Sequence, residues 1–263
     1  MSADAGSPER APLGSLASLA ATDWSPWPTP EILETTPSTM TEVERRAAHS
    51  APEGTVVVAE EQTAGRGRRG RAWESSARAG LWWSLLLRPQ MPADRLGWLP
   101  LVVGIGVARG LRVALDVEVT LKWPNDVLVD GGKLAGILAE RLADGSVIVG
   151  VGINVDQDES ELPDGGASLR TVGIPADRTA VLIDVLSAVA GTYREWLAGM
   201  DVSQEYVGLS ATLGQEVRAD LGDRVVIGHA VRLGPSGELV VVDAGGVEHE
   251  LSAGDVTLAR REP

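Results

Sequence analysis

Apolar residues along this chain fall into short runs separated by polar or turn residues, and into two longer stretches with helical spacing. Short apolar or β-branched runs of this kind indicate buried strands. We expect such strands at residues 55–59, 81–87, 117–123 and 146–155. The apolar stretch 94–115 and the amphipathic stretch 178–199 predict helices, the second with apolar residues at Val181, Val185, Val189 and Trp196.

Two local signals add a capped helix and a hairpin. We expect a helix over 38–49 with Ser38 or Thr41 as its N-terminal cap, since short hydroxyl side chains favour that position. The turn sequence Asp130-Gly131-Gly132 interrupts an apolar segment over 126–140, and this is typical of a β-hairpin.

Amino-acid composition and the spacing of turns divide the chain into three regions. Residues 1–28 are rich in Ala, Ser and Pro, which predicts a flexible lead-in. From residue 216 onward short β-rich runs alternate with glycine-containing turns, which predicts a small SH3-like barrel. We therefore expect a lead-in over 1–28, a main domain over 29–212 and a C-terminal domain over 213–263.

Charge and residue usage exclude several classes of protein. Acidic residues outnumber basic ones by 37 to 23, whereas proteins that coat nucleic acid are normally basic. The chain has no cysteine, which rules out disulfides and thiolate metal sites. We find neither the run of about 20 apolar residues that a membrane span requires nor a secretory signal. We expect a soluble cytoplasmic protein that binds neither nucleic acid nor membrane.

Lysine and asparagine are scarce and clustered. The only lysines are Lys122 and Lys133, and the only asparagines are Asn125 and Asn154. Arginine-favouring codon usage explains the scarcity of lysine without any function. A lysine that persists in such a chain is also consistent with a need for a compact point charge.

A glycine- and arginine-rich loop, Gln62-Thr63-Ala64-Gly65-Arg66-Gly67-Arg68-Arg69-Gly70-Arg71-Ala72-Trp73, is the strongest local feature. Glycines let the backbone approach a ligand and offer amide donors to an anion. Arginines bind carboxylate or phosphate in a bidentate manner. The sequence therefore favours an anion-binding loop, while a solvated turn and an RNA contact remain alternatives.

The segment Lys122-Trp123-Pro124-Asn125-Asp126, followed by Lys133, is the second candidate. Pro124 fixes the end of a strand, so that Asn125 and Asp126 project from a turn. Lys133 would lie at the mouth of the hairpin, where a bound carboxylate or phosphate would partner its charge. Alternatively, these residues only form a turn. Asn154, at the end of Gly150-Val151-Gly152-Ile153-Asn154, either contacts a base or ends a strand.

Together the motifs GRGRRGRxW, KWPNDxxxxxxKLAGIL and GxGIN closely resemble the biotin–protein ligase family over residues 35–260. The resemblance implies an α/β catalytic domain with a mixed sheet, shared with lipoate–protein ligases, and a C-terminal SH3-like domain. It also implies a two-step reaction. Biotin and MgATP give biotinyl-5′-adenylate and pyrophosphate, and a lysine of biotin carboxyl carrier protein then displaces AMP.

The resemblance assigns site residues by position. The biotin-binding set is Ser38, Thr39, Gln62, Arg66, Gly67, Arg68, Lys133, Gly136 and Leu138. The ATP- and adenylate-binding set is Arg66, Arg68, Arg69, Trp73, Asn125, Lys133 and Asn154. Met40 stands where Asn or Gln is common in the family.

The implied chemistry suits these residue types. Attack of a carboxylate on the α-phosphate brings two anions together, so Arg68, Lys133 and Mg²⁺ would neutralise the developing charge. In the second step Asp126 would orient the carrier amine or accept its proton. The sequence does not indicate the metal ligands.

Two rival functions remain at this stage. A lipoate–protein ligase shares the fold and the adenylate chemistry, and a nucleic-acid-binding module would use the arginine-rich loop. About 30 residues precede the predicted catalytic domain, which is too few for a winged helix. We therefore expect a monofunctional ligase rather than a bifunctional repressor, and a monomer or weak homodimer.

Overall fold

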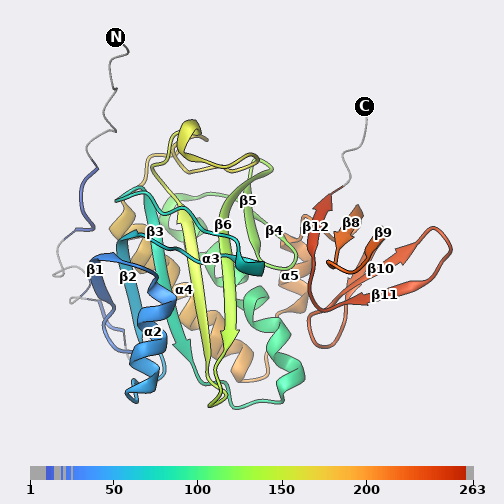
Figure 1. The fold of residues 1–263 in the computed structure, drawn as a ribbon, viewed down its shortest axis with the longest axis horizontal. Helices are drawn as coiled ribbons and strands as arrows, with labels where there is room; N and C mark the ends of the chain where they lie inside the picture. The colour runs from blue at the N-terminus through green and yellow to red at the C-terminus, as the bar shows by residue number, and fades with distance from the viewer. Residues whose placement is uncertain (1–9, 15–18, 20–21, 25, 259–263) are drawn as a thin grey trace, which may run out of the picture.

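The computed structural model describes residues 10–14, 19, 22–24 and 26–258, and its main layer is a mixed seven-stranded sheet (Figure 1). The strand order is β1-β2-β3-β7-β6-β5-β4. Strand β1 is parallel to β2, and the other neighbours are antiparallel. The strands are β1 (Glu31–Thr36), β2 (Val56–Gln62), β3 (Gly80–Leu87), β4 (Thr120–Lys122), β5 (Asp126–Val129), β6 (Gly132–Arg141) and β7 (Val147–Asn154).

Helices cover both faces of this sheet (Figure 1). Helix α2 (Thr39–Ala48) packs Met40 and Val43 against one face, in a small core with Val57, Leu86 and Ile148. The opposite face carries the main core beneath α3 (Leu99–Leu115), which follows the 3₁₀ segment η2 (Ala93–Trp98), and α4 (Arg178–Leu197). The predicted helices are thus confirmed.

A close crossing joins α3 to α4. A Cβ atom on Gly106 would lie 2.6 Å from Val189 Cα, and one on Gly110 would lie 2.4 Å from Val185 Cα. The two glycines therefore allow backbone-level packing. The apolar segment Ala93–Leu115 is long enough to cross a membrane by composition, but 67% of its most apolar window is buried inside the protein. It is the core helix of this fold.

The C-terminal region forms a second sheet with the order β11-β10-β9-β8-β12, and all of its pairings are antiparallel. Its strands are β8 (Glu216–Asp220), β9 (Val225–Leu233), β10 (Leu239–Asp243), β11 (Glu248–Leu251) and β12 (Asp255–Leu258). This agrees with the predicted SH3-like domain. Indole N–H groups of the main domain hold it: Trp98 donates to the Pro235 carbonyl at 2.9 Å and Trp123 to the Gly237 carbonyl at 3.0 Å.

The structure corrects several expectations. Helix α2 begins at Thr39, so Thr41 is not its cap, and Ser38 occupies the N-cap position without a side-chain capping hydrogen bond. The strand expected over 117–123 is limited to β4, and β1 and α5 (Ser203–Leu209) were not predicted.

Residues 10–14 of the expected lead-in have irregular structure and contact the main domain. Gly14 N–H donates to Thr179 Oγ1 at 2.7 Å, and Arg178 donates to the Ala11 carbonyl at 2.7 Å. The rest of the expected lead-in lies largely outside the described residues.

Candidate active site

A cavity of about 420 Å³ opens on the face of the main sheet that carries α2. Every site residue predicted from the sequence lines it, except Arg69. The lining residues among them are Ser38, Thr39, Gln62, Arg66, Gly67, Arg68, Trp73, Asn125, Asp126, Lys133, Gly136, Leu138 and Asn154. Segments far apart in the chain therefore converge on one site.

The floor of the cavity is a row of directly paired residues across the sheet. Lys122 pairs with Asp126, Asp126 with Gly136, and Gly136 with Gly152. A Cβ atom would lie 2.7 Å from the Trp73 ring if placed on Gly136, and 2.5 Å if placed on Gly152. Because glycine has no side chain at these two positions, the flat Trp73 indole packs directly on the sheet.

Lys133 reaches the cavity because of a bulge in β6. Val127 pairs with Ala135 but Leu128 pairs with Lys133, so one extra residue separates the two pairs on β6. Strict alternation from Gly136 would turn Lys133 to the opposite face, and a bulge re-aims a side chain in this way. The ammonium group then lies 2.6 Å from Asp126 Oδ1 and 5.3 Å from the centroid of the Trp73 ring.

Arg68 supplies a second, more buried cation. Its guanidinium donates to Asn125 Oδ1 at 3.0 Å and to the Gly254 carbonyl at 3.1 Å. Burial lowers the pKa of Arg68 below its ordinary value, because loss of water disfavours the charged form. Among the described residues no carboxylate forms an ion pair with Arg68, so an anionic ligand would supply the missing counter-charge.

The other arginines of the loop have partners outside the cavity floor. Arg66 forms an ion pair with Glu140 at 2.6 Å. Arg69 and Arg71 both contact Asp255, at 3.3 and 2.8 Å. The structure therefore directs Arg69, which we expected at the adenylate, toward the C-terminal domain. This domain also closes one side of the cavity.

The other end of the cavity carries neutral hydrogen-bonding groups. Gln62 Oε1 accepts from Thr39 N–H at 2.9 Å, and Gln62 Nε2 donates to Ser75 Oγ at 2.9 Å. The Ser38 hydroxyl is buried and has no partner among the described residues. Because an unpaired buried hydroxyl is costly, it is suited to a polar ligand group.

Met40 adds an apolar surface beside these groups. It is 3% exposed, and its side chain packs against Gly150, on which a Cβ atom would lie 2.9 Å from Sδ. The family that the sequence resembles commonly has Asn or Gln at the position of Met40. This chain instead has an apolar side chain in contact with Gly150.

Asn154 holds the backbone around Lys133. Its Nδ2 donates to the Lys133 carbonyl at 3.3 Å and to the Ala167 carbonyl at 3.0 Å, and its Oδ1 accepts from Gln157 Nε2 at 3.1 Å. Gln157 is 3% exposed and was missed from the sequence. Gln157 lies three residues after Asn154, the last residue of the motif GxGIN. A single polar residue in a loop gives no indication from the sequence that it is buried.

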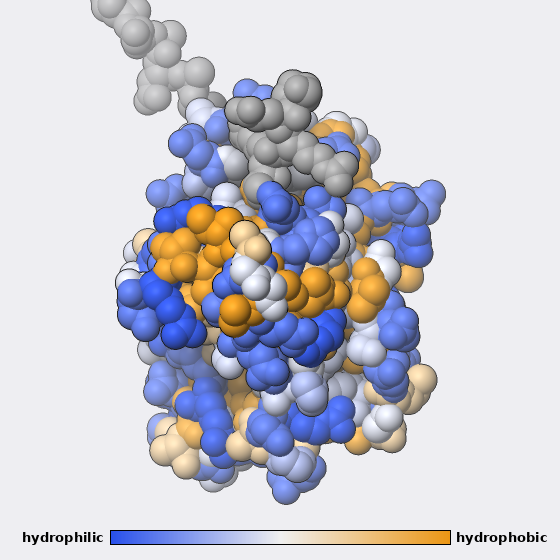
Figure 2. Space-filling model, turned by 90° about the vertical axis from the view of Figure 1, so that its right-hand side faces the viewer, coloured by the Kyte–Doolittle hydropathy of each residue, from blue (hydrophilic) through white to orange (hydrophobic). Residues whose placement is uncertain are grey.

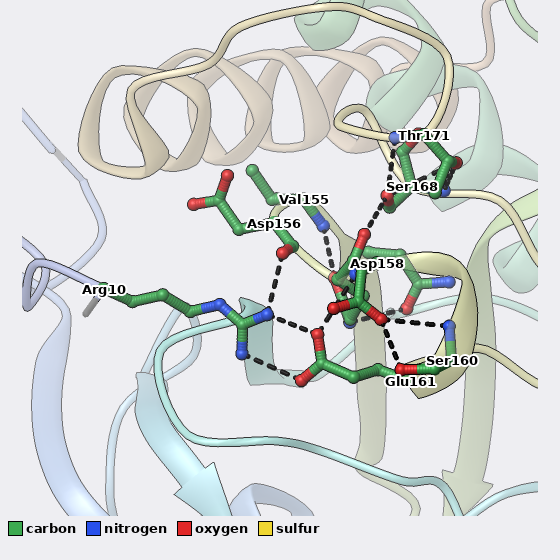
Figure 3. A network of polar contacts seen from close by, with 10 residues as sticks. Arg10, Val155, Asp156, Asp158, Ser160, Glu161, Ser168 and Thr171 are labelled. Atoms are coloured by element: carbon green, nitrogen blue, oxygen red, sulfur yellow. Dashed lines mark hydrogen bonds and ion pairs between the residues drawn. The ribbon is translucent and has the colours of Figure 1, made fainter. Parts of the chain in front are cut away.

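The wall of the cavity beyond Asn154 is fixed by the network in Figure 3. Glu161 lines the cavity, and its carboxylate accepts from Asp158 N–H at 3.1 Å and from the Arg10 guanidinium. Arg10 also donates to the Asp156 carbonyl at 2.8 Å. The hydrogen bond from Arg10 is the main cause of a lowered pKa of Glu161. The segment around Arg10 thus supports the wall from outside.

The described residues include no group of three or more His, Asp or Glu side chains placed to hold a metal ion. Mg²⁺ is commonly bound through substrate phosphates with one or two carboxylates. A metal bound in that way needs no cluster of three protein ligands.

One cavity thus combines a narrow floor over Gly136 and Gly152, a neutral polar end and the cations Arg68 and Lys133, which suits an elongated ligand with an anionic group. The sequence model of the Biotin/lipoate A/B protein ligase family matches residues 32–158. The biotin--[acetyl-CoA-carboxylase] ligase of Mycobacterium tuberculosis is 39% identical over 244 residues, which are 90% of this chain and 91% of that protein. The chain therefore belongs to the biotin protein ligases within that family.

Two further comparisons agree with this assignment. The biotin protein ligase from Aquifex aeolicus in complex with biotin and ATP has a TM-score of 0.76 and 33% identity, over 88% of this chain and 98% of that chain. The bifunctional ligase/repressor BirA of Bacillus subtilis is 33% identical over 85% of this chain, but the match covers 71% of that protein. The resemblance stated from the sequence is confirmed, and biotin is favoured over lipoate and over nucleic acid.

Proposed function

We propose that this protein activates biotin with MgATP as biotinyl-5′-adenylate and transfers the biotinyl group to a lysine of a carboxylase carrier domain. One observation carries the proposal: a single cavity joins the neutral polar end at Ser38 to the cations Arg68 and Lys133. The relatives described as biotin ligases support the choice of biotin.

In the first step the biotin carboxylate attacks the α-phosphorus of ATP, and pyrophosphate leaves. Lys133 and Arg68 would contact the carboxylate and the α-phosphate, where their charges offset the repulsion between the two anions. Bound Mg²⁺ would neutralise charge on the leaving pyrophosphate. Ser38, Thr39 and Gln62 would hydrogen-bond the ureido ring, and Gly136 and Leu138 would line the valeryl chain.

In the second step the carrier lysine attacks the acyl carbon of the mixed anhydride. An amide bond forms, the bond to the phosphate oxygen breaks, and AMP leaves. The attacking amine loses a proton, and Asp126 would accept it or orient the amine. The loop containing Arg66, Gly67 and Arg68 would shield the anhydride from water.

The wider setting is part of the same proposal. The Mycobacterium tuberculosis relative, described as a biotin--[acetyl-CoA-carboxylase] ligase, supports a carboxylase carrier domain as the protein substrate. The formal charge of −14 supports an enzyme that does not bind nucleic acid. We further propose a cytoplasmic enzyme that is a monomer or weak homodimer.

The test is exchange of radiolabelled pyrophosphate into ATP with biotin, with lipoate and with neither. We expect exchange that depends on biotin and Mg²⁺, followed by labelling of an added carrier domain. Exchange with lipoate alone would replace biotin by lipoate as the substrate. Exchange with neither acid, together with an unlabelled carrier domain, would refute the proposal.

A further inference from the structure

Lys122 has no role in the chemistry derived above, although it is one of the two lysines in the chain. Its ammonium group lies 3.7 Å from Asp126 Oδ2, while Lys133 lies 2.6 Å from Asp126 Oδ1. One carboxylate is thus held by both lysines, one on each oxygen. We propose that Lys122 is a positioning residue that keeps Asp126 in place for the transfer step; this rests on the proposed function.

The position of Lys122 is set by the sheet. Lys122 and Asp126 are directly paired across β4 and β5, so their side chains lie on the same face and both line the cavity. Asn125 N–H donates to the Lys122 carbonyl at 3.2 Å, which closes the turn between them. The backbone pairing therefore keeps the two side chains next to one another whether or not a ligand is bound.

The two lysines have different second partners. The Lys133 ammonium lies above the Trp73 ring, next to the floor where the reacting carboxylate and phosphate would bind. In the proposed first step Lys133 therefore turns its charge toward those anions. Lys122 then remains as the close cation on Asp126. The contact of Lys133 with Asp126 would be given up and that of Lys122 kept, because only Lys122 is the cross-strand neighbour of Asp126.

The other groups near Asp126 cannot replace Lys122. Arg68 contributes its charge at longer range, while its hydrogen bonds go to Asn125 and to the Gly254 carbonyl. Tyr206 on α5 is buried, and burial followed by the negative charge of Asp126 raises the pKa of its hydroxyl. That hydroxyl has no hydrogen-bond partner among the described residues. Loss of Lys122 would therefore leave a carboxylate with 15% side-chain exposure without a close cation during transfer.

The two steps can be measured separately in the whole enzyme. Adenylate formation is followed by pyrophosphate exchange, and transfer by mixing enzyme loaded with biotinyl-adenylate with an excess of carrier domain in a single turnover. For Lys122→Met we expect the transfer rate to fall on the order of 10- to 100-fold more than the exchange rate, because misplacing a reacting group is costly. Lys122→Arg should restore most of the transfer rate, because it restores a cation.

Asp126→Asn provides the matched control. If Lys122 acts through Asp126, the double variant Lys122→Met/Asp126→Asn should transfer about as slowly as Asp126→Asn alone, since residues acting as a unit are non-additive. Equal losses of exchange and transfer in Lys122→Met would overturn the inference, and so would additive losses in the double variant. If Lys122→Met does not fold, the comparison of Lys122→Arg with Lys122→Gln gives the same decision. Absence of biotin-dependent exchange in the unmodified enzyme would instead refute the proposed function.

Discussion

Replacing Lys133 by alanine should separate activity from stability more sharply than any other single change in the cavity. In the proposed first step its ammonium neutralises charge that develops between the biotin carboxylate and the α-phosphate. Loss of one such contact costs on the order of 10²–10³ in rate, or about 2.7–4 kcal/mol. We therefore expect biotin-dependent pyrophosphate exchange to fall by on the order of 10²–10³.

The effect on folding should be much smaller, for two reasons visible in the structure. The Lys133 side chain is 34% exposed, and partly exposed ion pairs contribute at most about 1 kcal/mol. Its partner Asp126 also keeps Lys122 at 3.7 Å, so no buried carboxylate is left wholly unpaired. For a domain of this size the melting temperature should fall by less than about 4 °C.

Arg112→Ala is a matched control, because Arg112, on α3, forms an exposed ion pair with Glu118, and neither residue lines the cavity. It should leave exchange within about twofold of the unmodified protein, as is usual for surface changes. Exchange of near-normal rate in a folded Lys133→Ala variant would refute the assignment. A loss of exchange that only parallels loss of folded protein would also contradict the argument.

Three further predictions concern the loop and the wall of the cavity. Trypsin should cut after Arg66, Arg68 or Arg69 in the free protein, and biotin with MgATP should suppress these cuts; equal digestion with and without ligands would show that the loop is not a lid. Arg68→Gly should release adenylate that labels lysines of an added bystander protein. Mass spectrometry should find self-labelling only at Lys122, Lys133 and the α-amino group, because the chain has no other lysine. An unlabelled bystander would contradict this. Arg10→Ala should lower the stability measured in urea above pH about 4.5, because the Arg10 hydrogen bond lowers the pKa of Glu161 in the folded state. This difference should shrink as the pH falls through that lowered pKa, and a difference independent of pH would exclude the Glu161 carboxylate as its source.

The parts of the fold that could be predicted carry their signal in a few neighbouring residues. The hairpin between β5 and β6 is one example, since Asp130 and Gly131 have φ values of 48° and 79°. Two successive positive φ values are what an Asp-Gly turn between twisted strands requires. The arginine-rich loop was predictable for the same reason, because closely spaced glycines and arginines suit an anion in any fold. In contrast, α5 is seven residues long and has no comparable pattern.

The remaining parts of the site depend on pairings that no local pattern contains. Arg10 and Glu161 are separated by 151 positions, and their contact exists only because residues 10–14 dock beside the wall of the cavity. The bulge that turns Lys133 into the cavity depends on how β5 and β6 align, and alternation along β6 alone predicts the opposite face. Gln157 donates from Nε2 to Oδ1 of Asn154 and so holds that side-chain amide in place. The sequence could therefore identify groups that line the cavity, whereas the groups that hold them in place are defined by tertiary contacts. Lys122 combines the two cases. As one of only two lysines it stood out in the sequence, but its proposed role in positioning Asp126 follows only from their cross-strand pairing.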